Sequence, residues 1–65
     1  MPIIPLAVVK RLIKKAGAER VSDSAAAALA EELEDSAIAI AEKATKLARH
    51  AKRKTVTGKD IKLAK

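Results

Sequence analysis

The apolar and polar positions of the chain follow a helical period in three segments. Over residues 6–16, apolar residues recur every three or four positions, and four bases lie on the opposite side, namely Lys10, Arg11, Lys14 and Lys15. Residues 22–51 contain neither Gly nor Pro and predict one long helix, and residues 59–65 predict a third, very short one. The predicted fold class is all-α, with a short, a long and a short helix in a single domain over residues 1–65.

Residues at the ends of these segments carry helix-boundary signals. Gly17 can end the first helix, because glycine adopts the left-handed conformation without steric penalty. Ser22 or Asp23 can cap the long helix. Thr57 followed by Asp60 resembles a capping box for the third helix, with Asp in place of the preferred Glu or Gln. Two brief loops therefore join the three helices, and the second of them is strongly basic.

The long helix predicts a partner chain. It would span roughly 40 Å, which is longer than a small domain is wide. Four of its apolar residues lie within about 40° of one another on a helical wheel, and this seam consists of Leu29, Leu33, Ile40 and Leu47. Ile38 points almost the opposite way. Because the chain has no Cys and one His, neither disulfides nor zinc can supplement its small core. We therefore expect a second copy of the long helix to cover the seam.

The charge pattern indicates a polyanionic partner. The formal net charge is +6, distributed as +4 over residues 1–20, −6 over residues 21–42 and +8 over residues 43–65. If the two basic ends meet in space, they form one basic surface. The chain has no aromatic residue that could stack on bases, so contacts with the backbone of a polyanion are favoured.

Several other functions are disfavoured. Three serines could be grouped with His50 and an Asp as a triad, but none follows the pattern of a nucleophile elbow, so we expect no catalytic residue. The carboxylates between residues 31 and 35 are more simply a solvated helix face than a metal site, and no cofactor is expected. No apolar run is long enough for a membrane span and no signal peptide is recognisable, so a soluble, intracellular protein is expected. A membrane-active cationic helix over residues 6–16 is a remote alternative.

Four motifs in this order and at this spacing resemble archaeal histones: AGAERVS at 16–22, LARHA at 47–51, RKTV at 53–56 and DIKLA at 60–64. The resemblance implies a histone fold, in which two chains form an intertwined head-to-tail dimer with their long helices crossed. The first loop of one chain would lie beside the second loop of the other. The implied function is chromosome compaction in the cytoplasm, where homodimers bind, bend and wrap double-stranded DNA without sequence specificity and assemble side by side into filaments.

The resemblance also implies which residues meet DNA. The expected DNA-binding residues are Arg11, Lys14, Arg20, Lys54 and Thr55. Arg20 corresponds to an arginine that enters the minor groove, whereas Arg11, Lys54 and Thr55 correspond to phosphate contacts. Such contacts position the duplex without reading base edges, so any sequence preference is expected to come from DNA flexibility.

Further residues correspond to structural and assembly positions. The resemblance implies that Arg53 and Asp60 pair to fix the second loop to the third helix. Leu29, Leu33 and Ile40 would form the core between the two chains of a dimer. Gly17 would let neighbouring turns of wrapped DNA approach closely. The surface between one dimer and the next would consist of Leu47, His50, Asp60 and Leu63.

Three departures from the family pattern bear on these expectations. The family commonly has Gly where this chain has Lys52, so we expect the long helix to end without its usual cap and with an added positive charge. The third helix is short, which would trim the surface between dimers, and Ala25–Ala28 is unusually small. The alternative is therefore a module that pairs with a different chain, such as a paralogous histone, or a dimer that bends DNA without extended polymerisation.

Overall fold

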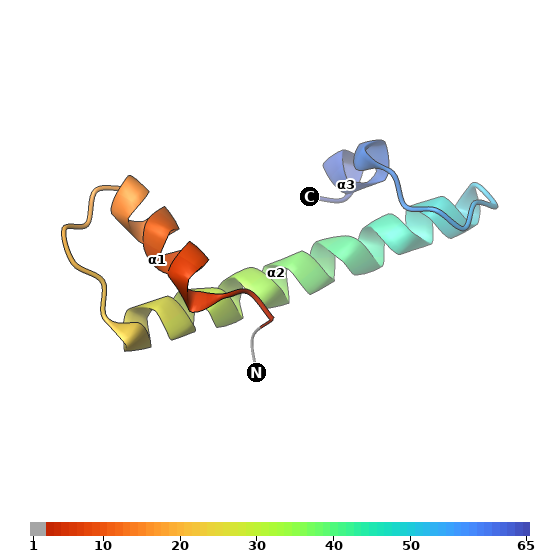
Figure 1. Ribbon diagram of the computed structural model, residues 1–65. Helices are drawn as coiled ribbons and strands as arrows, with labels where there is room; N and C mark the ends of the chain where they lie inside the picture. Colours follow the sequence, from red (N-terminus) through yellow and green to blue (C-terminus); the bar gives the residue numbers. More distant parts are fainter. Residues whose placement is uncertain (1–2) are drawn as a thin grey trace. The chain divides into compact units, whose positions relative to one another are not determined.

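The computed structural model describes residues 3–65, and in this range the chain forms three α-helices and no strand (Figure 1). The helices are α1 (Leu6–Lys15), α2 (Asp23–His50) and α3 (Gly58–Ala64). Met1 and Pro2 lie outside the described residues. The prediction of a short, a long and a short helix is confirmed, and each helix bound lies within one residue of the expected position. None of the helices in residues 3–65 is long and apolar enough to cross a membrane.

Two compact units make up the chain, one ending at Asp35 and the other beginning at Ser36, so α2 contributes to both. In the first unit, α1 packs on the beginning of α2 around three fully buried side chains, those of Val9, Ala26 and Ala30. Five partly buried apolar residues surround this cluster: Ile4, Ile13, Val21, Leu29 and Leu33. The small alanines of α2 leave room for α1 to approach closely, and Val9 fills that space.

Hydrogen bonds define both ends of the first loop. The Gly17 N–H donates to the Lys14 carbonyl at 2.9 Å and the Ala18 N–H donates to the Ile13 carbonyl at 3.4 Å. Together with the positive φ of Gly17, +120°, these bonds form a Schellman motif that ends α1. At the start of α2, the Ser22 Oγ accepts a hydrogen bond from the Ala25 N–H at 3.1 Å. Ser22 is therefore the N-cap of α2, and the two boundary signals read from the sequence are confirmed.

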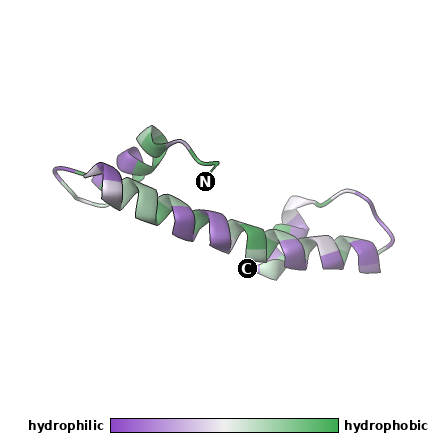
Figure 2. Ribbon diagram, turned by 90° about the horizontal axis from the view of Figure 1, so that it is seen from below, coloured by the Kyte–Doolittle hydropathy of each residue, from purple (hydrophilic) through white to green (hydrophobic). Residues whose placement is uncertain are grey.

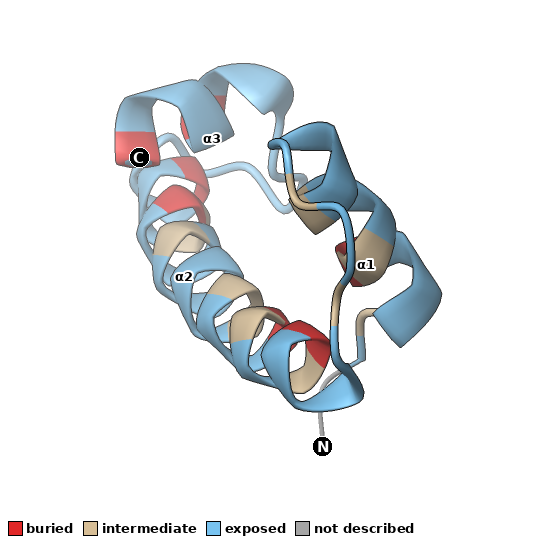
Figure 3. Ribbon diagram, turned by 90° about the vertical axis from the view of Figure 1, so that its left-hand side faces the viewer, coloured by how far each residue is buried: buried red, intermediate tan, exposed pale blue. Residues whose placement is uncertain are grey.

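The second unit buries little apolar surface of its own. Its buried positions are Ala44, Ala48, Ala64 and Asp60, and no larger apolar side chain is buried among the described residues of this unit. Figure 3 shows how few positions of the ribbon are buried. Apart from the half-buried Ile40, the larger apolar side chains stay accessible, from 37 % exposed at Leu47 to 68 % at Leu63. An alanine core of this kind is small for a segment that carries so many larger apolar residues.

The predicted seam of α2 is only partly covered within the chain. Leu29 and Leu33 pack against the cluster under α1, so they contribute to the core of their own chain. Ile40 is half-buried, and Leu47 is exposed. Figure 2 shows hydrophobic and hydrophilic stretches alternating along the face of α2 that is turned to the viewer. The seam thus presents apolar surface to solvent, increasingly so toward the end of α2.

The end of α2 corrects one expectation. The helix was expected to end without its usual cap, because Lys52 occupies the place of a glycine. Instead, the Lys52 N–H donates to the Arg49 carbonyl and the Arg53 N–H donates to the Ala48 carbonyl, both at 2.9 Å. This is a complete Schellman motif with Lys52 in the left-handed conformation, φ +58°. Both hydrogen bonds of the cap therefore form with a lysine at the position where glycine fits best.

Candidate nucleic-acid interface

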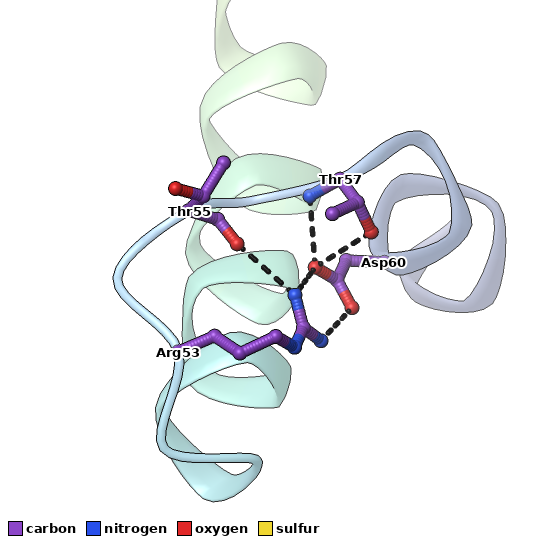
Figure 4. Close-up of polar contacts among 4 residues, drawn as sticks. All are labelled: Arg53, Thr55, Thr57 and Asp60. Carbon is purple, nitrogen blue, oxygen red and sulfur yellow. Dashed lines mark hydrogen bonds and ion pairs between the residues drawn. The ribbon is translucent and has the colours of Figure 1, made fainter.

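A network of polar contacts fixes the shape of the second loop (Figure 4). The Arg53 guanidinium donates from Nη1 to Asp60 Oδ2 at 2.9 Å and from Nη2 to Asp60 Oδ1 at 2.8 Å. Nη1 also donates to the Thr55 carbonyl at 3.0 Å. The Thr57 N–H and the Thr57 hydroxyl both donate to Asp60 Oδ2, at 2.9 and 3.1 Å. The loop is therefore tied to the first turn of α3 by a bidentate ion pair and by a capping box.

Asp60 is the centre of this network. It is 4 % exposed, whereas the Arg53 side chain is 40 % exposed. The hydrogen bond from Arg53, followed by that from the Thr57 backbone, holds the pKa of the Asp60 carboxyl well below its usual range. The same partnership raises the pKa of Arg53. Asp60 is thus ionised at neutral pH, and the positive charge of Arg53 is balanced within the chain.

The second loop also has two exposed residues whose side chains take no part in this network. Lys54 and Thr55 are exposed. Figure 4 shows the Thr55 carbonyl turned toward Arg53 while its hydroxyl points away from the network. The network therefore presents a lysine ammonium and a threonine hydroxyl from a loop of fixed shape. Both groups are suited to donate hydrogen bonds to phosphate oxygens.

The other expected DNA-binding residues belong to the first unit. Arg11 and Lys14 lie exposed on α1, and Arg20 lies exposed in the loop between α1 and α2. Lys10 differs from its neighbours, because its ammonium forms an ion pair with Asp23 in the first turn of α2. This contact lowers the pKa of Asp23. Among the described residues of the first unit, the cations outside any ion pair are therefore Arg11, Lys14, Lys15 and Arg20. They include the three named from the sequence.

The expected assembly residues occupy different environments. Leu47, His50 and Leu63 are exposed, as a contact surface between dimers requires. Asp60 is buried, and both of its carboxylate oxygens already accept hydrogen bonds from its own chain. Oδ1 accepts one of these hydrogen bonds and Oδ2 the others. The part of Asp60 in a surface between dimers stays a prediction. Gly17 has open space around it, since no heavy atom beyond the glycine and its two chain neighbours lies within 4 Å of the place where a Cβ would be.

Comparison with known proteins identifies the chain. The sequence model of the family described as histone-like transcription factor (CBF/NF-Y) and archaeal histone matches residues 2–64. The chain belongs to this family. It is 59 % identical to an archaeal histone HAN1 subunit of Thermococcus zilligii over 64 residues, which cover 98 % of this chain and 96 % of the relative. It is 52 % identical to probable archaeal histone 3 of Methanocaldococcus jannaschii, with the same coverage.

Membership of the archaeal histone family confirms the histone fold predicted from the sequence. It also confirms that the chain is not an enzyme, because proteins of this family are structural DNA-binding proteins. In residues 3–65 no group of three His, Cys, Asp or Glu side chains could hold a metal ion. The carboxylates of Glu31, Glu32 and Asp35 are exposed on α2 instead.

Two features of this histone-family chain were not predicted from its sequence. The first is the left-handed conformation of Lys52, because lysine does not mark a helix end as glycine does. The second is an open hollow on α2 that is lined by Ile38, Ala41, Glu42, Thr45, Lys46 and Arg49. The orientation of Ile38 away from the seam gave the only indication of this second face.

Proposed function

We propose that this chain is an archaeal histone that forms a homodimer, bends and wraps double-stranded DNA without sequence specificity, and compacts the chromosome. The observation that carries the proposal is the second loop. Arg53 and Asp60 fix its shape while Lys54 and Thr55 remain exposed. A loop that is fixed by its own ion pair and presents hydrogen-bond donors to solvent is suited to bind a phosphate backbone. Its location in the cell would be the chromosome.

The apolar surface of the chain supports dimerisation. The second unit buries alanines and one aspartate, while Ile61 and Val56 remain about 40 % exposed. Ile40 and Leu47 continue the apolar seam along α2. A second chain whose long helix crosses this seam would cover the residues that the first chain leaves open. The two units of each chain would then share one core, and the single predicted domain would be completed by the partner.

A head-to-tail dimer would also unite the two halves of the DNA surface. Arg20 belongs to the first unit, and Lys54 and Thr55 belong to the second. In the proposed dimer the first loop of one chain lies beside the second loop of the other, so each pair of loops forms one DNA-binding site. Arg20 would enter the minor groove, with Lys54 and Thr55 on the adjacent phosphates.

A salt titration of duplex binding tests this surface. The double variant Arg20→Ala, Lys54→Ala should lose compaction at moderate salt and give a shallower dependence of affinity on salt, because fewer counterions are released. The matched control is Lys43→Ala, Lys62→Ala, which removes two exposed lysines outside the loops. Circular dichroism of each variant checks that the fold is intact. Equal compaction by the loop variant and the wild type would refute the assigned surface.

We further propose that dimers continue along DNA through Leu47, His50 and Leu63. Each of these side chains is exposed, and His50 ends α2 beside the second loop. His50→Glu should leave dimers that bend DNA but protect only short lengths from nuclease. Ala41→Glu introduces the same charge on the opposite face of α2 and should leave the protection pattern unchanged. An unaltered nuclease ladder for His50→Glu would rule out this surface.

The alternative is a histone that pairs with a paralogue or acts as separate dimers. The Thermococcus zilligii relative is named as one subunit of its histone, which favours a further chain in that protein. Light scattering of the pure protein, with and without DNA, separates the alternatives. Growth beyond a dimer only in the presence of DNA supports the homodimeric filament. A pure chain that stays unfolded or monomeric until a paralogue is added supports the heterodimer.

A further inference from the structure

We propose that Lys52 is an additional DNA-contacting residue, whose ammonium binds a phosphate beside the site of Lys54 and Thr55. The inference deepens the proposed function and rests on it. Among residues 3–65, Lys52 is the only non-glycine residue with a positive φ.

The two Schellman motifs of the chain allow a direct comparison. α1 ends at Gly17, with φ +120°, and α2 ends at Lys52, with φ +58°. In both motifs the residue with positive φ donates its N–H to a carbonyl three residues earlier, at 2.9 Å. The following residue, Ala18 or Arg53, donates to a carbonyl five residues earlier. The backbone task is therefore the same at both ends, and the lysine side chain adds nothing to it.

A lysine at this position carries a steric penalty that glycine avoids. In the left-handed conformation the Cβ of an L residue lies too close to the following carbonyl oxygen. Strained backbone of this kind tends to persist at functional sites, where the side chain has a use that offsets the strain. The strained backbone at Lys52 therefore indicates that its ammonium has a function.

The charges around Lys52 leave its ammonium available. In the part of the chain that the structure describes, the ion pairs are Lys10 with Asp23 and Arg53 with Asp60. Within the basic run of the second loop, the charge of Arg53 is therefore balanced by a buried carboxylate. Lys52 and Lys54 flank it, and both are exposed. The loop presents two free cations separated by one internally paired arginine.

The macrodipole of α2 is the competing explanation for a positive charge at this end. A cation near the last turn of a helix is favourable on electrostatic grounds. However, the last turn of α2 already contains Arg49 and His50, and Lys46 lies one turn earlier. Lys52 is not required to supply the first cation there. The two explanations differ in what they predict for DNA binding, because a dipole role involves no phosphate.

The test is the salt dependence of binding to a fluorescent duplex, measured by anisotropy. Lys52→Asn and Lys52→Gly remove the charge and keep a residue that tolerates the left-handed conformation, so both should fold. Lys52→Arg keeps the charge. Lys43→Gln is the matched control, because it removes an exposed lysine of α2 outside the second loop.

With two loops per dimer, the slope of log affinity against log salt should be shallower by about 1.8 for Lys52→Asn and Lys52→Gly. Between about 50 and 200 mM salt, this corresponds to a loss of affinity roughly 12-fold smaller than that of the wild type. Lys52→Arg should restore the steeper slope, and Lys43→Gln should retain it. Lys52→Gly should also unfold at a temperature no lower than the wild type.

Two results overturn the proposal. One is an unchanged slope for both neutral variants. If their unfolding temperature is also lower, Lys52 is assigned to the helix dipole. The other is an equal change for Lys43→Gln, which would mean that any exposed lysine acts in the same way. Failure of the proposed function itself looks different, because the wild type would then show no salt-dependent binding to duplex DNA.

Discussion

Val9→Ala should loosen α1 from α2 without removing any charge from the proposed DNA-binding surface. Val9 is fully buried between α1 and the alanines of α2. The substitution removes two carbon atoms from the core, which costs about 1.6 kcal/mol at roughly 0.8 kcal/mol per buried group. The cavity left behind adds to this, so a loss of about 2 kcal/mol per chain is expected. For a chain of this size, that loss lowers the unfolding temperature by about 10 °C.

The neighbouring residue provides the control. Val8 is 42 % exposed on the same helix, so Val8→Ala changes composition and helix propensity in the same way while removing little buried surface. Its effect should stay within about 0.5 kcal/mol. Both variants are measured by thermal unfolding, followed by circular dichroism at one fixed protein concentration, because the stability of a dimer depends on concentration.

The packing of α1 is tested by comparing the stability losses of the two variants. A larger loss for Val9→Ala supports the packing of α1 described above. If Val8→Ala is the more damaging change, then α1 is rotated about its axis and its cationic face points elsewhere. In that case the proposal that Arg11 and Lys14 belong to the DNA-binding surface would be wrong as well.

Two further predictions concern the second loop and the start of α2. Hydrogen bonds from Arg53 and Thr57 lower the pKa of Asp60 in the folded state. The ionised Asp60 therefore stabilises the fold fully above the usual Asp pKa of about 3.9. This stabilisation is lost as the pH falls below that value. Urea unfolding at several pH values should therefore show a steeper acid loss for the wild type than for Asp60→Asn, and parallel curves would contradict this. Ser22→Ala should lower the stability by about 1 kcal/mol through loss of the N-cap. Ser24→Ala should have little effect, because the Ser24 hydroxyl contacts Ser22 rather than the backbone. Equal shifts of the unfolding temperature for the two variants would disprove the cap.

The helix boundaries could be predicted from the sequence because their signals are local. Gly17 and Ser22 act through their own backbone and side chain, and the pair Thr57 and Asp60 acts within one turn. Helical periodicity also placed Val9 among the apolar positions of the first helix. It could not show that Val9 would be buried while Leu12 stays 48 % exposed, because that depends on how α1 packs on α2.

The candidate site, like the fold, could be predicted only in part from the sequence. A basic loop was visible in the sequence, and the resemblance supplied the pairing of Arg53 with Asp60. The burial of Asp60 and the use of both its oxygens depend on the fold of the loop around it. The conformation of Lys52 was not predictable from its residue type, because backbone hydrogen bonds override the preference of a lysine for negative φ. The expectation about the cap was wrong for this reason.

The ion pair between Arg53 and Asp60 has a consequence for the thermodynamics of association. A flexible loop must give up conformational freedom when it meets a ligand, and that loss reduces affinity. In the free chain, Arg53 already donates a hydrogen bond to the Thr55 carbonyl, and the Thr57 N–H already donates one to Asp60. The second loop is therefore preorganised, and little ordering entropy remains to be lost when it meets a duplex. Its affinity should then vary with ionic strength far more than with any change that merely stiffens the loop.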